Sequence, residues 1–249
     1  MLLKIGLIVL VWLLPQAARA EAARFDYYLL ALSLAPAFCE DEPGRKRKFA
    51  QCQRLSEPAF RQTPLTLHGL WPNRADRQHP AYCGRSAHAS FCSLPAVSLP
   101  GDSRARLARV MPATADCLDR HEWAKHGSCS GLAEADYFAV ATALTERVNR
   151  ALGQELAQHM GRDVSLERLR EVLGRTDPAL KAAVTFDCQT PRSTVPAKRR
   201  PMLREVRVYF ARDPRTHEPG QPLAYQQAGR RHFQSGCPGG QAYVDSPLD

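Results

Sequence analysis

Apolar residues recur along the chain with two different spacings, and each spacing predicts a different kind of element. Short runs of aliphatic and aromatic residues predict four strands: Phe25 to Ala35, Leu65 to Leu70, Val184 to Cys188, and Arg204 to Ala211. In the last run apolar and polar residues alternate, so Glu205 and Arg207 are expected on the face opposite Val206.

The run from Leu65 to Leu70 also contains a histidine. Successive side chains of a strand point to opposite faces, which puts His68 on one face with Thr66 and Leu70. The other face is expected to hold Leu65, Leu67 and Gly69. His68 is thus predicted to point away from both of its neighbours in the sequence.

Helical spacing, with a period of about 3.6 residues, predicts four further elements: Gly101 to Val110, Asp116 to His126, Ala133 to Gly153, and Ser165 to Leu173. Ser165 is a suitable N-terminal cap. Residues 73–100 are dense in Pro, Gly, Ser and His and predict a long loop. Because strands at the start, middle and end enclose grouped helices, we expect an α+β fold, with one domain over residues 21–249.

The N-terminal segment has the layout of an export signal. Lys4 precedes the apolar run from Ile5 to Leu14, and Ala18-Arg19-Ala20 places small residues at the two positions that a signal peptidase reads. This run of about ten residues is too short to span about 30 Å of hydrocarbon. Residues 1–20 are therefore predicted to be a cleaved signal peptide, and the mature protein to be periplasmic or secreted and free of the membrane.

The number of cysteines agrees with export. Eight cysteines follow the predicted signal, which indicates up to four disulfides: Cys39, Cys52, Cys83, Cys92, Cys117, Cys129, Cys188 and Cys237. Cys39 is expected to pair with Cys52 because the two are close in sequence. The absence of a CxxC pair argues against a structural zinc site.

Basic residues outnumber acidic ones. Loss of Lys4 and Arg19 with the signal lowers the formal net charge from +9 to +9 − 2 = +7. This excess favours polyanions or membrane surfaces as partners, although solvated loops alone account for it equally well. The runs Arg45 to Lys48 and Lys198 to Arg200 are expected to be such loops.

Two segments about fifty residues apart contain the candidate chemistry. The first is Leu65 to Pro72, with His68 and Trp71, and the second is His121 to Cys129. On an ideal helix one arc of about 140° holds four polar side chains of the second segment: His121, Lys125, Glu122 and His126. Trp123 falls on the opposite side, where it is expected to join the core, and Gly127 is placed to end the helix.

His121-Glu122 resembles the start of the zinc-peptidase signature HExxH, which requires the second histidine four residues on. Here the interval is five, and Lys125 would add a cation beside any metal. Two histidines and a lysine fit metal-free transesterification of RNA much better. RNA supplies its own 2′-hydroxyl nucleophile, so one histidine can act as base and the other as acid. DNA lacks this hydroxyl and is expected to be inert.

Both segments, His68-Gly69-Leu70-Trp71-Pro72 and His121-Glu122-Trp123-Ala124-Lys125-His126-Gly127-x-Cys129, resemble the two active-site segments of the ribonuclease T2 family. The likeness extends over most of the mature chain, and the order of the cysteines resembles the bacterial periplasmic branch typified by ribonuclease I. The resemblance implies a central antiparallel sheet flanked by helices and endonucleolytic cleavage of single-stranded RNA, without metal or cofactor, to 2′,3′-cyclic phosphates and then 3′-phosphates. Little base preference is implied.

The same resemblance assigns roles to individual residues. His126 aligns with the general base and His68 with the general acid, while Glu122 and Lys125 stabilise the transition state. His121 aligns with a phosphate-binding position, and Trp71 with an aromatic residue that contacts a base or ribose. The family pairs Cys188 with Cys237. Cys129 is expected to bind Cys83 or Cys92, with Cys117 taking the other.

A second hypothesis is an exported basic protein that binds nucleic acid or another polyanion without cleaving it. It uses the charge and the disulfides but needs none of the histidines. The default oligomeric state is a monomer, and intact RNA after long incubation would favour the binder.

Overall fold

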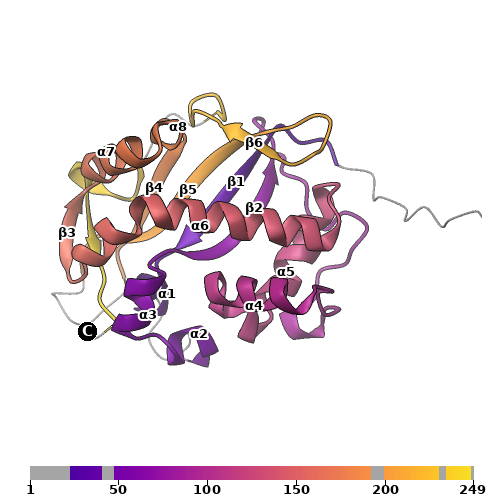
Figure 1. Cartoon of the computed structure of the whole chain (residues 1–249), viewed down its shortest axis with the longest axis horizontal. Coiled ribbons are helices and arrows are strands. Elements are labelled where there is room, and N and C mark those ends of the chain that lie inside the picture. Colours follow the sequence, from indigo (N-terminus) through magenta and orange to yellow (C-terminus); the bar gives the residue numbers. More distant parts are fainter. Residues whose placement is uncertain (1–22, 41–47, 192–198, 230–233, 248–249) are drawn as a thin grey trace, which may run out of the picture.

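The computed structural model describes residues 23–40, 48–191, 199–229 and 234–247, and Figure 1 shows their arrangement. The predicted signal peptide, residues 45–47 of the first basic run and Lys198 of the second lie outside these ranges. Within them, no helix is long and apolar enough to cross a membrane.

The sheet is built on four long strands in the order β2-β1-β5-β4, all antiparallel to their neighbours. They are β1 (Tyr27–Ser33), β2 (Thr66–Asn73), β4 (Val184–Gln189) and β5 (Met202–Arg212), which confirms the four predicted strands. Four shorter strands extend the sheet: β3 (Arg162–Ser165), β6 (Pro219–Pro222), β7 (Gln234–Ser235) and β8 (Gln241–Val244). Since β7 pairs parallel with β4, and β8 with β5, the sheet is mixed rather than wholly antiparallel.

Four helices correspond to predicted ones: α4 (Gly101–Val110), α5 (Leu118–Lys125), α6 (Glu134–Gln158) and α7 (Leu166–Thr176). Ser165 caps α7 as expected, since its hydroxyl accepts a hydrogen bond from the Arg168 backbone N–H at 3.4 Å. Shorter helices that the sequence did not reveal follow β1 and β3: α1 (Ala35–Glu40), α2 (Ala50–Gln53), α3 (Glu57–Gln62) and α8 (Pro178–Lys181).

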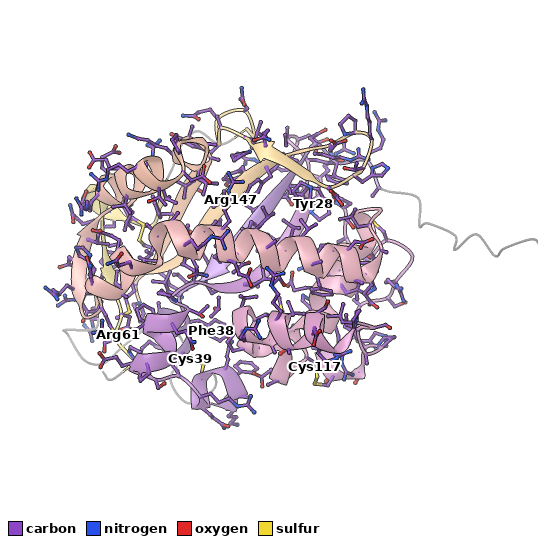
Figure 2. The ribbon with its side chains drawn as sticks, viewed as in Figure 1. Tyr28, Phe38, Cys39, Arg61, Cys117 and Arg147 are labelled. Carbon is purple, nitrogen blue, oxygen red and sulfur yellow. A yellow bond between two sulfur atoms is a disulfide. The ribbon has the colours of Figure 1, made fainter. Side chains whose placement is uncertain are left out.

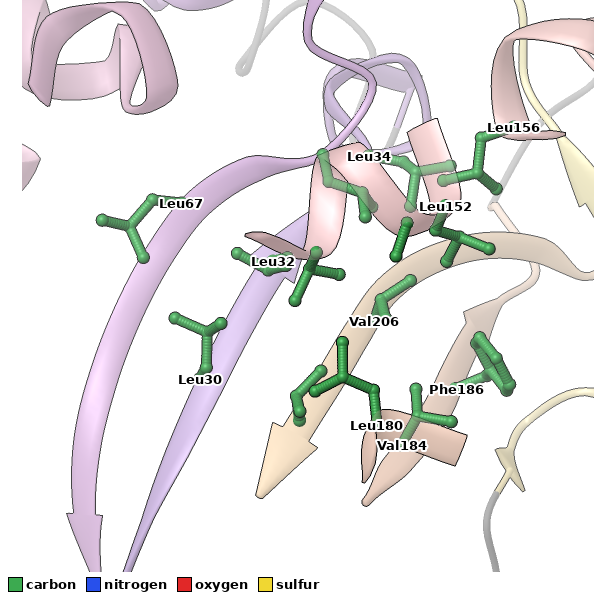
Figure 3. Packing of buried hydrophobic residues seen from close by; sticks show 14 of the residues in the cluster. Leu30, Leu32, Leu34, Leu67, Leu152, Leu156, Leu180, Val184, Phe186 and Val206 are labelled. Carbon is green, nitrogen blue, oxygen red and sulfur yellow. The ribbon is translucent and has the colours of Figure 1, made fainter. Parts of the chain in front are cut away.

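The main core lies between the sheet and α6, which runs across the strands (Figure 1). Leu30, Val206 and Phe186 come from three neighbouring strands and face Leu152 and Leu156 of α6 (Figure 3). Burying a side chain of this size stabilises the fold by about 1.5 to 3 kcal/mol. The polar face of β5, with Glu205, is therefore left on the other side of the sheet, as its alternation predicts.

Strand β2 departs from the predicted alternation at His68. Ala31 of β1 pairs with Gly69, whereas the next residue, Leu32, pairs with Leu67, so His68 is the extra residue of a β-bulge. The bulge inverts the faces beyond it, and Leu70 joins Leu67 in the main core. The prediction that Leu70 shares a face with His68 was therefore wrong.

The predicted helix from Asp116 to His126 is interrupted near its start. Cys117 adopts a left-handed backbone conformation, φ 61°, which separates a 3-10 turn over Pro112–Asp116 from α5. At the other end His126 caps α5, and the chain continues into a second 3-10 turn, Gly127–Cys129. Gly127 is required for packing, because an added methyl group would overlap the Trp123 ring.

All eight cysteines form disulfides. Cys39–Cys52 and Cys188–Cys237 confirm the predicted pairs, and the open choice resolves as Cys83–Cys129 and Cys92–Cys117. Cys39 and Cys117 both lie below α6 in the view of Figure 2. Two of the bridges join the loop after β2 to the two ends of α5.

Candidate active site

Strand β2 and helix α5 bring the two predicted segments into contact. The indole N–H of Trp71 donates a hydrogen bond of 2.7 Å to Oε2 of Glu122, whose side chain is almost fully buried. A methyl group at Gly69 would overlap both the Glu122 carboxylate and the Trp71 indole nitrogen. Glycine is therefore required where the strand passes beneath this carboxylate.

The two candidate catalytic histidines pack on the same tryptophan. The ring of His68 meets Trp71 edge-on at 5.1 Å between ring centroids, and the ring of His126 stacks on it at 5.2 Å with an interplanar angle of 30°. Trp123 packs instead toward the core, against Tyr137 at 5.7 Å, as predicted. Trp71 thus holds one imidazole from each segment on a single rigid surface.

A carboxylate that the sequence did not single out completes the surroundings of His68. Nδ1 of His68 lies 2.8 Å from Oε1 of Glu205, whose side chain is buried. The other oxygen of Glu205 accepts a hydrogen bond of 2.9 Å from Arg207, which also contacts Asp187 at 3.2 Å. The only sequence signal was that Glu205 occupies the polar face of a predicted strand.

The pKa values of His68 and Glu205 are shifted by burial and by their contact with each other. Desolvation lowers the pKa of His68, but the hydrogen bond to Glu205 and the charges of Glu122 and Glu205 outweigh it, so this pKa is raised above 6.5. Desolvation raises the pKa of Glu205, yet its bond to His68 and the neighbouring Arg207 lower that pKa to about 2. An ionised carboxylate only accepts hydrogen bonds, so Nδ1 of His68 carries a proton.

His126 has the opposite environment. Desolvation, and then the positive charge of Lys125, lower its pKa to about 2, so the ring is neutral at pH 7. Desolvation raises the pKa of Glu122 to about 7, against the opposing effects of His68, Trp71 and Lys125. The site therefore pairs one histidine that retains a proton with one that accepts a proton.

His121, the other histidine of the second segment, lies near His68 and Glu205. Its ring stacks on Phe91 at 4.0 Å between centroids, and it lines a cavity of about 340 Å³ together with His68 and Glu205. Desolvation and the charge of Lys125 lower its pKa to about 4. Among the described residues, no group of three or more His, Cys, Asp and Glu side chains is arranged to hold a metal ion.

Comparison with known proteins places this chain in a family. The sequence description of the ribonuclease T2 family matches residues 25–218. The chain belongs to the ribonuclease T2 family. Ribonuclease I of Escherichia coli K12 is 32% identical over 163 residues, which are 57% of this chain and 61% of that one. A ribonuclease of Aeromonas hydrophila is 35% identical over 130 residues, or 52% of this chain and 49% of its own.

The matched region is thus about half to three-fifths of the length of these bacterial relatives of the ribonuclease T2 family. Solved structures share the fold. Ribonuclease MC1 from bitter gourd seeds superposes with a TM-score of 0.54 at 19% identity, covering 88% of this chain and all of its own. RNase NT, solved in complex with 5′-AMP, gives a TM-score of 0.54 at 17% identity and covers 80% and 97%.

Proposed function

We propose that this protein is an endoribonuclease that cleaves single-stranded RNA without a metal ion or cofactor and with little base preference. The products are fragments ending in 2′,3′-cyclic phosphate, which are then hydrolysed to 3′-phosphates. The observation that carries this proposal is the packing of two histidines on one tryptophan, with the Glu205 carboxylate 2.8 Å from Nδ1 of His68. Membership of the ribonuclease T2 family supports it.

In this mechanism neutral His126 removes the proton from the 2′-hydroxyl, and the oxygen attacks the neighbouring phosphorus. Protonated His68 gives its proton to the departing 5′-oxygen. Lys125 offsets the negative charge that develops on the phosphoryl oxygens. Because the pKa of Glu122 is about 7, its protonated form is available near neutrality to donate a hydrogen bond to the same oxygens.

Two further residues are proposed to bind substrate. His121 stands beside the cavity next to His68, where it contacts a phosphate. Trp71 offers the edge of its ring to a base or ribose, in addition to the packing role that its contacts show. We also propose that residues 1–20 are removed as a signal peptide and that the mature protein is a periplasmic or secreted monomer. Four disulfides favour an oxidising compartment.

The test is digestion of matched RNA and DNA homopolymers by the purified, oxidised protein in the presence of a chelator. RNA is expected to be cleaved to cyclic phosphate ends, since all proton transfers come from side chains, while DNA stays intact for want of a 2′-hydroxyl. End groups are read by mass spectrometry. Loss of activity on chelation would refute the metal-free mechanism, and intact RNA would favour a polyanion-binding protein.

The Glu205 hydrogen bond yields a pH prediction. The protonated form of His68 is needed, so activity is present below its folded pKa and is lost as the pH rises through that value. Glu205→Gln removes the negative charge that helps to raise this pKa and leaves only a neutral amide oxygen as acceptor for Nδ1. The alkaline limb of kcat/KM against pH is therefore expected to move toward lower pH in the variant.

Glu155→Gln is the matched control for Glu205→Gln. Glu155 is also buried and accepts a hydrogen bond of 2.8 Å from Arg168, but the only histidine with which it pairs among the described residues is His159, at 3.6 Å, not one of the proposed site histidines. Its replacement is expected to lower thermal stability and to leave the pH profile unchanged. An unchanged alkaline limb in Glu205→Gln would show that Glu205 does not control the proton on His68.

A further inference from the structure

A second cavity adjoins the one that contains His68. It has a volume of about 550 Å³ and lies between α3 and α4, with Phe60 and Val110 among its apolar lining. Thr66 and Gln51 line both cavities, and Thr66 lies two residues before His68 in β2. The two cavities are therefore neighbours that share part of their lining beside His68.

The wall of this second cavity is positively charged. The cavity is lined by Arg54, which caps α2, by Arg109 of α4 and by Arg150 of α6, and all three side chains are exposed. Its acidic lining residue, Glu146, forms an ion pair with Arg106. The pKa of Glu146 is lowered first by that hydrogen bond and also by the charges of Arg150 and Arg109. The three arginines outnumber the one glutamate, so the lining carries a net positive charge that attracts the phosphates of a nucleic-acid strand.

The proposed chemistry fixes which part of an RNA strand reaches this place. His68 protonates the departing 5′-oxygen, which belongs to the nucleotide on the 3′ side of the cleaved bond. The cavity that touches His68 must therefore receive that nucleotide, and the next one lies farther along the same path. Resting on the proposed function, we infer that the 550 Å³ cavity binds the phosphates of RNA nucleotides downstream of the cleavage site.

The test uses DNA strands that contain one ribonucleotide, so that cleavage occurs at a single known bond. One series is lengthened only on the 3′ side of that bond and a second only on the 5′ side, each starting from a dinucleotide. We expect kcat/KM to increase with 3′ extension. Arg109→Gln combined with Arg150→Gln should abolish most of that increase and leave dinucleotide cleavage unchanged.

Salt dependence gives a second readout. Each phosphate contact to a single strand contributes about 0.7 to the slope of log affinity against log salt. With the long 3′ substrate, the double variant should therefore lose about 1.4 from this slope. The matched control is Arg175→Gln with Arg215→Gln, which removes two exposed charges from α7 and from the turn before β6. It is expected to behave like the wild type.

The outcomes separate the two proposals. If wild-type protein cleaves no substrate, not even the dinucleotide, the proposed function fails and the inference fails with it. If the dinucleotide is cleaved but 3′ extension brings no gain, or the gain survives in the Arg109 and Arg150 double variant, the inference alone is overturned. A gain confined to 5′ extension likewise overturns it.

Discussion

Replacement of His126 by alanine is expected to lower kcat on RNA by about a hundred- to ten-thousand-fold, the usual contribution of a general base. Burial and Lys125 hold the pKa of His126 near 2, so the ring is always available as an acceptor at neutral pH. His68→Ala should cause a loss of similar size because the departing oxygen then has no acid. Initial rates on a homopolymer RNA measure both effects.

A matched control for these variants is His88→Ala, which removes an exposed histidine from the long loop. Its rate should equal that of the wild type. Because the rings of His68 and His126 both contact Trp71, near-ultraviolet circular dichroism and thermal unfolding check that the site remains folded. A folded His126→Ala protein with near-normal kcat would mean that another group takes the proton from the 2′-hydroxyl.

Lys125→Met is expected to reduce kcat/KM by about a hundred- to a thousand-fold, the range found when one transition-state donor is removed. Methionine keeps most of the aliphatic stem, so the change removes mainly the charge. The pKa of His126 should rise, since Lys125 is one of its causes, but desolvation is the larger cause. The ring therefore remains neutral at pH 7, and the loss reports on phosphate charge.

Lys125→Arg retains the charge and should recover part of the activity. Lys181→Met, an exposed lysine of α8, should have no effect. If Lys125→Met and Lys125→Arg are equally impaired, the shape of the lysine side chain matters more than its charge. If neither is impaired, Lys125 does not act on the transition state.

The fixed angular step of a helix predicted that Glu122 and His126 lie on one arc, and both side chains contact Trp71 of β2. The sequence could not predict the bulge at His68, since an extra residue in a strand depends on how β1 pairs with β2. Leu70 was consequently assigned to the wrong face. The early kink at Cys117 was equally hidden, since a left-handed backbone conformation is uncommon for a residue other than glycine.

Glu205 shows a different limit. Alternation correctly placed it on the polar face of β5, where a solvated carboxylate is the ordinary expectation. Its contact with His68 depends on the strand order, in which only β1 lies between β5 and β2. This order brings Oε1 of Glu205 to 2.8 Å from Nδ1 of His68, 137 positions away in the sequence. Pairings among Cys83, Cys92, Cys117 and Cys129 stayed open for the same reason, since spacing along the chain does not determine distance in space.

Two disulfides, Cys83–Cys129 and Cys92–Cys117, fasten a long loop to the segments on either side of α5. This helix contains three of the proposed site residues, His121, Glu122 and Lys125, and is capped by a fourth, His126. Chains whose thiols are still reduced lack both fastenings. If the protein degrades RNA as proposed, we expect a chain with reduced thiols to hold its active-site helix less firmly and therefore to be less harmful to the RNA of the cell that makes it. Under the proposed export, disulfide formation in the oxidising compartment is then the step that completes the active site.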